Sequence, residues 1–89
     1  MAWTIEISTT PRKVLAKLDR SVSRRIFDFL IRRVAVLDDP RSIGEPLKGP
    51  RFGMLWKYRV GDYRILCDIR DNEVVILVVR IGHRKDIYS

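Results

Sequence analysis

Residues 55–81 read LWKYRVGDYRILCDIRDNEVVILVVRI, and this stretch decides the fold. Its first half alternates apolar with polar or charged residues on either side of Gly61-Asp62, which is a two-residue hairpin signal. Asp71-Asn72 indicates a second tight turn. The aliphatic run that follows, residues 74–79, is typical of a strand buried on both faces. The stretch therefore predicts three consecutive antiparallel strands.

The residues before this stretch predict one more strand and two helices. Residues 3–8 alternate large apolar with polar side chains, which is the period of a strand. Thr10-Pro11 is typical of a helix start, because a proline at the first helical position loses only an N–H that has no partner. Ser21 is expected to cap a second helix over residues 22–37, and residues 41–53 are expected to form a loop. The apolar residues of the second helix are Val22, Ile26, Phe29, Leu30 and Leu37, with Phe27, Ile31 and Val34 widening the stripe.

These elements fit one small domain. Eighty-nine residues can bury a single core and no second one. Two helices joined by a short turn are expected to lie antiparallel and to cover one face of a sheet. The prediction is a single α+β domain over residues 1–89. Its mostly antiparallel sheet of about four strands is covered on one face by two antiparallel N-terminal helices, in the order strand, helix, helix, strand, strand, strand.

The chain is strongly basic, with 18 Lys and Arg against 11 Asp and Glu, a formal net charge of +7 and a pI near 10.2. Thirteen of the 18 are arginine, whose planar fork suits phosphate contacts better than a lysine does. This composition favours nucleic acid as the partner, with an acidic protein as the second choice.

Single copies of cysteine and histidine limit the chemistry further. They exclude an internal disulfide and every multi-cysteine zinc pattern, so neither a metal nor a cofactor is expected. The N-terminal residues do not resemble a signal peptide, and no segment approaches the roughly 20 apolar residues that span a bilayer. A cytoplasmic protein without a membrane partner is the expectation.

The first hairpin brings like charges together. A two-residue turn places Val60 opposite Tyr63, and therefore Arg59 directly opposite Arg64, with Lys57 two residues along on the same face. Like charges in directly opposed positions destabilise a sheet, so a phosphate between them is one expectation. The alternative is that both arginines are simply solvated near the hairpin end.

Four nearby residues have structural explanations. On the register of two tight turns, Arg80 would stack on Tyr63. Asp68 and Arg70 are expected to form ion pairs with neighbours, and Cys67 belongs to an alternating apolar set and is expected in the core.

The tail after the last strand offers two further candidates. His83 lies beside the basic cluster, and histidine is the side chain that titrates nearest to neutral pH. If the tail takes a helical turn, Arg84 and Tyr88 share a face.

Three motifs taken together resemble the RelE toxins of the RelE/ParE superfamily, the toxic halves of bacterial toxin–antitoxin pairs. The motifs are Leu47-Lys48-Gly49, residues 55–65 and residues 81–88. The resemblance implies a small sheet flanked by two antiparallel helices, and cleavage of messenger RNA in the ribosomal A site. It also implies neutralisation by a RelB-like antitoxin in a hetero-oligomer.

The resemblance also implies which residues act. Lys57, Arg64 and Arg84 match family positions, Tyr88 is similar to the family's C-terminal tyrosine, and Leu55 stands where some members carry a second lysine. The expected catalytic set is Lys57, Arg64, Arg84 and Tyr88, with His83 and Arg59 as further catalytic or substrate-binding candidates and Lys48, Arg51 and Lys85 as RNA contacts.

The chemistry of RNA cleavage agrees with this set. Attack by the neighbouring 2′-hydroxyl needs a base, positive charge around the phosphorane and an acid for the leaving 5′-oxygen. Lys57 is a candidate base, with Tyr88 and His83 as rivals. Arg64 would clamp the phosphate, and Arg84 would stabilise it or protonate the leaving group.

Two other functions remain as alternatives. A ParE-type toxin inhibits DNA gyrase as a protein ligand and has no RNase site. The combination of Lys57, Arg64, Arg84 and Tyr88 argues against it, because a non-enzymatic inhibitor has no need of that set. A degenerate member that only binds RNA is the third hypothesis.

Overall fold

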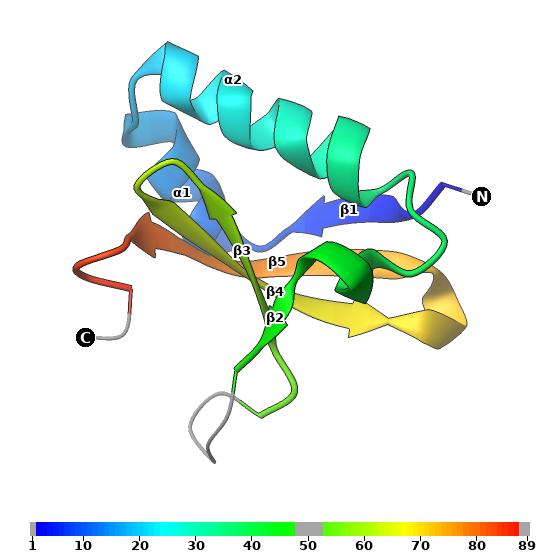
Figure 1. The fold of residues 1–89 in the computed structure, drawn as a ribbon. Helices are drawn as coiled ribbons and strands as arrows, with labels where there is room; N and C mark the ends of the chain where they lie inside the picture. Colours follow the sequence, from blue (N-terminus) through cyan, green and yellow to red (C-terminus); the bar gives the residue numbers. More distant parts are fainter. Residues whose placement is uncertain (1, 48–52, 88–89) are drawn as a thin grey trace.

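Two helices lie on one face of a five-stranded sheet in the computed structural model, which describes residues 2–47 and 53–87 (Figure 1). The sheet has the order β1-β5-β4-β3-β2. No helix of the described ranges is both long and apolar enough to cross a membrane. The elements are β1 (Thr4–Ile7), α1 (Thr9–Lys17), α2 (Arg20–Phe29), the π-helical turn η1 (Leu30–Val34), the 3₁₀ turn η2 (Pro40–Ile43), β2 (Glu45–Pro46), β3 (Trp56–Val60), β4 (Tyr63–Arg70), the 3₁₀ turn η3 (Asp71–Glu73) and β5 (Val75–His83).

The sheet has one strand more than the sequence predicts. β1 runs parallel to β5, and the other three pairs are antiparallel. The additional strand is β2, which pairs Glu45 with Lys57 and Pro46 with Trp56 at the edge of the sheet. Two residues that include a proline show no alternation, so the sequence predicts a loop over this segment. The α+β class and the single covered face are confirmed.

Both helices begin earlier than predicted. α1 begins at Thr9, so Pro11 is its third residue, where a missing N–H still costs no helical hydrogen bond. α2 begins at Arg20 with Asp19 at the N-cap position, and Ser21 therefore lies inside the helix. Each start moves by two residues and the element is kept. The predicted end of the second helix at Leu37 is wrong, because the regular helix stops at Phe29 and the π-turn that follows stops at Val34.

The second helix changes geometry before it ends. Its regular part stops at Phe29, and in the following π-turn the N–H of Ala35 donates to the carbonyl of Leu30 at 2.9 Å. The carbonyl of Ala35 accepts a 2.7 Å hydrogen bond from the N–H of Trp3, just before β1. This contact ties the end of the helix to the edge of the sheet.

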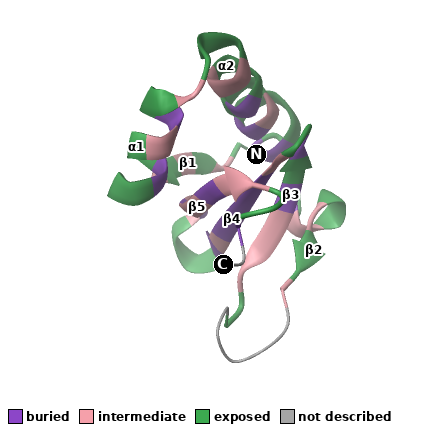
Figure 2. Ribbon diagram, turned by 90° about the vertical axis from the view of Figure 1, so that its left-hand side faces the viewer, coloured by how far each residue is buried: buried purple, intermediate pink, exposed green. Residues whose placement is uncertain are grey.

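The core lies between the two layers, where the buried residues gather (Figure 2). Cys67 is fully buried in it, as predicted, and burial raises the pKa of its thiol well above the ordinary value. Phe27 and Ile31 are 38% and 55% exposed, so they do not widen the buried stripe. The core residues are Leu15, Ile26, Leu30 and Val34 from the helical layer and Tyr58, Val60, Ile65, Cys67, Ile76, Val78 and Ile81 from the sheet.

The turn between β4 and β5 is longer than two residues, and this changes the register. Asp71–Glu73 form a 3₁₀ turn and Val74 takes a left-handed conformation with φ of 54°, so Arg70 pairs with Val75. An irregularity between Leu66 and Cys67 shifts the register once more. Arg80 consequently lies opposite Leu66, and the predicted stacking of Arg80 on Tyr63 is wrong.

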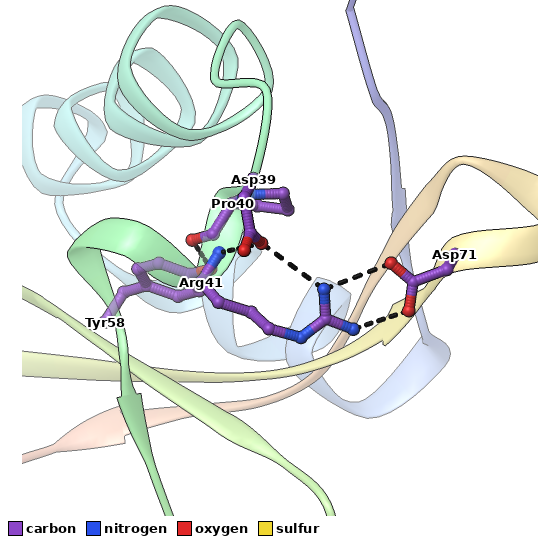
Figure 3. A network of polar contacts seen from close by, with 5 residues as sticks. All are labelled: Asp39, Pro40, Arg41, Tyr58 and Asp71. Atoms are coloured by element: carbon purple, nitrogen blue, oxygen red, sulfur yellow. Dashed lines mark hydrogen bonds and ion pairs between the residues drawn. The ribbon is translucent and has the colours of Figure 1, made fainter.

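Arg41 links the segment before β2 to the far end of the sheet (Figure 3). Its guanidinium bonds the Asp71 carboxylate at 3.1 and 2.6 Å and Asp39 at 3.3 Å, and it lies 5.8 Å from the centre of the Trp56 ring. The hydrogen bonds from Arg41 lower the pKa of the Asp71 carboxyl, and the same contact raises the pKa of Arg41. These contacts hold η2 beside the β4–β5 turn.

Tyr58 supplies the buried anchor of the same segment. Its hydroxyl donates a 2.6 Å hydrogen bond to the carbonyl of Pro40, and burial raises the pKa of the phenol, which keeps it a donor. We expect Tyr58→Phe to destabilise the protein by about 1–3 kcal/mol, because the buried carbonyl loses its partner. Urea unfolding measures this cost. Tyr63→Phe at a half-buried ring is the control, with an expected change within about 0.5 kcal/mol. Equal midpoints for the two variants would contradict the prediction.

Candidate active site

The site is built around the turn between β3 and β4. Val60 pairs with Tyr63, which confirms the two-residue Gly61-Asp62 turn, and Gly61 takes φ of 58°, a left-handed conformation that glycine adopts without strain. Arg59 lies directly opposite Arg64, also as predicted. The turn therefore places two arginines side by side on the face of the sheet that the helices do not cover.

Arg64 is buried by the turn itself. Only 9% of the residue is exposed, and its Nη1 donates 3.0 Å hydrogen bonds to the carbonyls of Gly61 and Tyr63. Hydrogen bonds from a charged donor are stronger than those between neutral groups, so these carbonyls explain how the sheet tolerates opposed arginines. The pairing does not require a bound anion. Both bonds use Nη1, and the edge formed by Nε and Nη2 is the edge of the fork that binds a phosphate in bidentate fashion.

Lys57 lies on the same face as Arg64. It pairs with Leu66 on β4, which makes Arg64 its diagonal neighbour, within reach of a long side chain. Its Nζ lies 3.5 Å from a carboxylate oxygen of Glu45 on β2, a residue that the sequence did not single out. An RNA phosphate that binds Lys57 therefore has to compete with Glu45.

Arg84 reaches the hairpin from the segment that follows β5. Its backbone N–H donates a 2.7 Å hydrogen bond to the carbonyl of Asp62, and its Nε lies 3.8 Å from the Asp62 carboxylate. The side chain is 56% exposed. The segment after β5 thus docks on the turn that Arg64 stabilises, and Arg59, Arg64 and Arg84 meet there.

His83 lies apart from these cations. It pairs with Tyr63, and the two rings meet edge to face with their centres 5.7 Å apart. Tyr63 packs against the core, so the imidazole is on the helix-covered side of the sheet, whereas Lys57 and Arg64 lie on the other side. Its Nδ1 accepts a 3.2 Å hydrogen bond from the N–H of Lys85.

The tail turns back under the open face of the sheet. The N–H groups of Asp86 and Ile87 both donate to the carbonyl of His83, and Ile87 is 1% exposed. A Cβ added at Gly82, which lies opposite Arg64, would come within 2.9 Å of the Ile87 side chain. The glycine therefore leaves room for Ile87 beside Arg64. The remaining predicted site residues, Tyr88, Lys48 and Arg51, lie outside the described residues.

Arg70 is not part of this group, whereas Arg80 lies on the same face of the sheet as Lys57 and Arg64. Arg80 is opposite Leu66 on β4, as Lys57 is from β3, so it is also a diagonal neighbour of Arg64. Arg70 pairs with Asp68 at 3.1 Å, as predicted, and with Glu73 at 3.9 Å, at the far end of β4. Glu45 and Asp62 are the two acidic residues near the site that the sequence did not single out. The sequence signal of Asp62 is its turn preference alone, and Glu45 belongs to a strand too short to show a pattern.

Comparison with known proteins agrees with this architecture. Residues 5–88 match the family described as ParE toxin of type II toxin–antitoxin systems. The chain belongs to the RelE/ParE superfamily of toxins. Toxin RelG of Mycobacterium tuberculosis is 31% identical to this RelE/ParE toxin over 88 residues, which cover 99% of the chain and 98% of RelG.

Solved structures show the same fold. The toxin–antitoxin complex RelBE2 of M. tuberculosis contains a chain that matches this toxin with a TM-score of 0.83 and 28% identity, over 97% of this chain and 95% of that one. A free mutant of the Escherichia coli toxin RelE matches with a TM-score of 0.76 and 24% identity, over 99% and 92% of the two chains. The resemblance inferred from the three motifs is confirmed at the level of the superfamily.

Proposed function

We propose that this toxin is a ribosome-dependent endoribonuclease that cleaves messenger RNA in the A site and thereby inhibits translation in the cytoplasm. One observation carries the proposal: Arg84 docks on the β3–β4 turn beside Arg64, and Lys57 lies diagonal to Arg64 on the same open face, so three different segments supply the cations. Converging cations on an open sheet face suit a phosphodiester whose negative charge increases during the reaction.

The proposed reaction needs no metal. The 2′-oxygen attacks the neighbouring phosphorus, the bond from phosphorus to the 5′-oxygen breaks, and a 2′,3′-cyclic phosphate forms. A base takes the proton of the 2′-hydroxyl and an acid protonates the leaving 5′-oxygen. Arg64 binds the phosphate, Arg84 stabilises its charge or protonates the leaving oxygen, and Lys57 or Tyr88 acts as the base.

The other residues have smaller roles in this proposal. The ring of His83 faces the covered side of the sheet, which makes it the weakest of the three candidate bases. Arg59 and Lys85 are exposed and would bind flanking phosphates together with Lys48 and Arg51. The ribosome would orient the 2′-hydroxyl for in-line attack, a contribution that an open sheet face does not make by itself.

We also propose a RelB-like antitoxin as the natural partner, in a toxin–antitoxin hetero-oligomer. The RelBE2 structure of M. tuberculosis and a RelE–RelB structure of Pyrococcus horikoshii, 24% identical with a TM-score of 0.76, are both toxin–antitoxin complexes. A net charge of +7 favours an acidic antitoxin segment over the basic hairpin end.

Inhibition of DNA gyrase is the second candidate, because the matching family carries the name of the ParE toxin. Gyrase poisoning induces the DNA damage response, whereas mRNA cleavage stops translation first. Scoring both responses after expression of the toxin separates the two functions. A third candidate, a member that binds RNA without cutting it, predicts that expression leaves messenger RNA intact.

A reconstituted translation system tests the main proposal. We expect purified toxin to cut mRNA inside the codon of the A site when ribosomes are present, and to leave the same mRNA uncut when they are omitted. Toeprinting of the ribosome-bound message locates the cut. Intact message with folded toxin in excess over ribosomes would refute the proposal.

A further inference from the structure

Arg25 of α2 reaches the hairpin turn from the helical layer. A Cβ placed on Gly61 would lie 3.3 Å from Nη1 of Arg25, 3.7 Å from its Cζ and 3.9 Å from its Nη2. The guanidinium therefore lies against the α-carbon of Gly61. The β3–β4 turn extends to the helical layer in the fold (Figure 1), so a residue 36 positions earlier in the chain becomes part of the hairpin end.

Gly61 lies between two guanidinium groups. Arg64 bonds its carbonyl oxygen from the open face of the sheet, and Arg25 approaches its α-carbon from the helical layer. A larger residue at position 61 would intrude on Arg25 and would also be strained by the left-handed backbone. The glycine thus allows the two cations to lie close together on two sides of one turn.

The hairpin end carries far more positive than negative charge. Arg25, Arg59, Arg64 and Arg84 lie at or beside the turn, and Asp62 is the turn's own carboxylate. None of the ion pairs among the described residues involves Arg25. Four guanidinium groups repel one another, and a polyanion relieves this repulsion.

We propose that Arg25 binds an RNA phosphate next to the scissile one, which extends the site from the sheet onto α2. This inference rests on the proposed function and identifies the path of its substrate. Arg25 and Arg64 lie on opposite sides of the turn, so they contact different phosphates. The RNA strand therefore passes around the hairpin end, with the scissile phosphate at Arg64 on the open face and a flanking phosphate at Arg25.

Salt-dependent binding tests the role of Arg25. The probe is a single-stranded RNA of about ten nucleotides with 2′-O-methyl groups throughout, which lack the attacking hydroxyl. Affinity is measured by fluorescence anisotropy between about 50 and 200 mM KCl, the range over which phosphate contacts are lost. Loss of one contact on a single strand lowers the slope of log affinity against log salt by about 0.7. We expect this change for Arg25→Ala, with affinity reduced about threefold to tenfold at low salt.

Arg24→Ala is the matched control. It removes the same charge from the neighbouring exposed position of the same helix. We expect Arg24→Ala to change the slope by less than half of the change expected for Arg25→Ala. We expect Arg25→Lys to keep the wild-type slope, because a lysine still neutralises one phosphate. A purely structural role for Arg25 would instead lower the urea midpoint and leave the slope unchanged.

The outcomes separate this inference from the proposed function. Equal slopes for Arg25→Ala and Arg24→Ala, or failure of the wild type to bind the probe, would overturn the role of Arg25. If wild-type toxin cuts no message on ribosomes but Arg25→Ala still loses the phosphate contact, the cleavage proposal fails and the RNA path around the hairpin remains.

Discussion

Replacement of Arg64 by alanine is expected to reduce the rate of mRNA cleavage on ribosomes by about 10²–10³-fold. This is the usual loss when one preorganised donor to the developing charge of a transition state is removed. Arg64 is held in place by the carbonyls of Gly61 and Tyr63, so its guanidinium does not have to be ordered during the reaction. Single-turnover cleavage of an mRNA in programmed ribosomes measures the effect, and growth arrest on expression provides an independent readout.

Arg70→Ala is the control for charge. Arg70 lies on the same strand and the same face, but its side chain is 43% exposed and pairs with Asp68 at the far end of β4. We expect this variant to cleave at close to the wild-type rate. If both variants lose activity equally, net charge and not position determines cleavage.

Arg64→Lys separates charge from geometry. Lysine keeps the charge but lacks the planar fork, so we expect activity between those of the wild type and Arg64→Ala. Because Arg64 also stabilises the turn, the urea midpoint of each variant has to be measured beside its activity. A folded Arg64→Ala protein that cleaves at the wild-type rate would remove Arg64 from the site.

The sequence predicted the site best where local geometry determines it. A two-residue turn fixes the cross-strand partners completely, so the pairing of Arg59 with Arg64 and the face of Lys57 followed from counting residues. Arg84 is different, because only the docking of the tail on Asp62 brings it to the hairpin.

Errors arose where distant segments decide the geometry. The 3₁₀ turn before β5 and the irregularity beside Leu66 moved Arg80 away from Tyr63 and put His83 in its place. Neither feature has a strong sequence signal, since Asp71-Asn72 also suits a two-residue turn. The sequence predicts only that Arg25 lies in a helix, because the approach of α2 to Gly61 depends on how the layers pack.

The fold was more predictable than the site. Period-two and period-3.6 patterns are set by burial, and β1, β3, β4 and both helices follow them, whereas β5 follows from its continuous aliphatic run. β2 and the π-turn depend instead on contacts between segments. Glu45 and Pro46 become a strand because β3 offers an unpaired edge. The π-turn ends where the carbonyl of Ala35 accepts a hydrogen bond from the N–H of Trp3, just before β1.

Leu30→Ala is expected to have the largest effect on stability. Leu30 is fully buried at the point where α2 passes into the π-turn, and it packs between the helical layer and the sheet. Truncation of a buried leucine costs about 2–5 kcal/mol, a large part of the roughly 5–15 kcal/mol that stabilises a typical domain. We expect the melting temperature to fall by roughly 10–30 °C, measured by circular dichroism.

Ile31→Ala is the matched control, because it removes an aliphatic side chain of the same size one residue further along. Ile31 is 55% exposed, so we expect its free energy of unfolding to change by about 0.5 kcal/mol or less. Equal losses for the two variants would mean that the outer surface of this turn is covered in solution. A loss for Ile31→Ala alone would mean that the helix is rotated relative to the sheet. That rotation would also move Arg25 away from Gly61, so the stability of this pair of variants is a direct check on the geometry from which the RNA path is inferred.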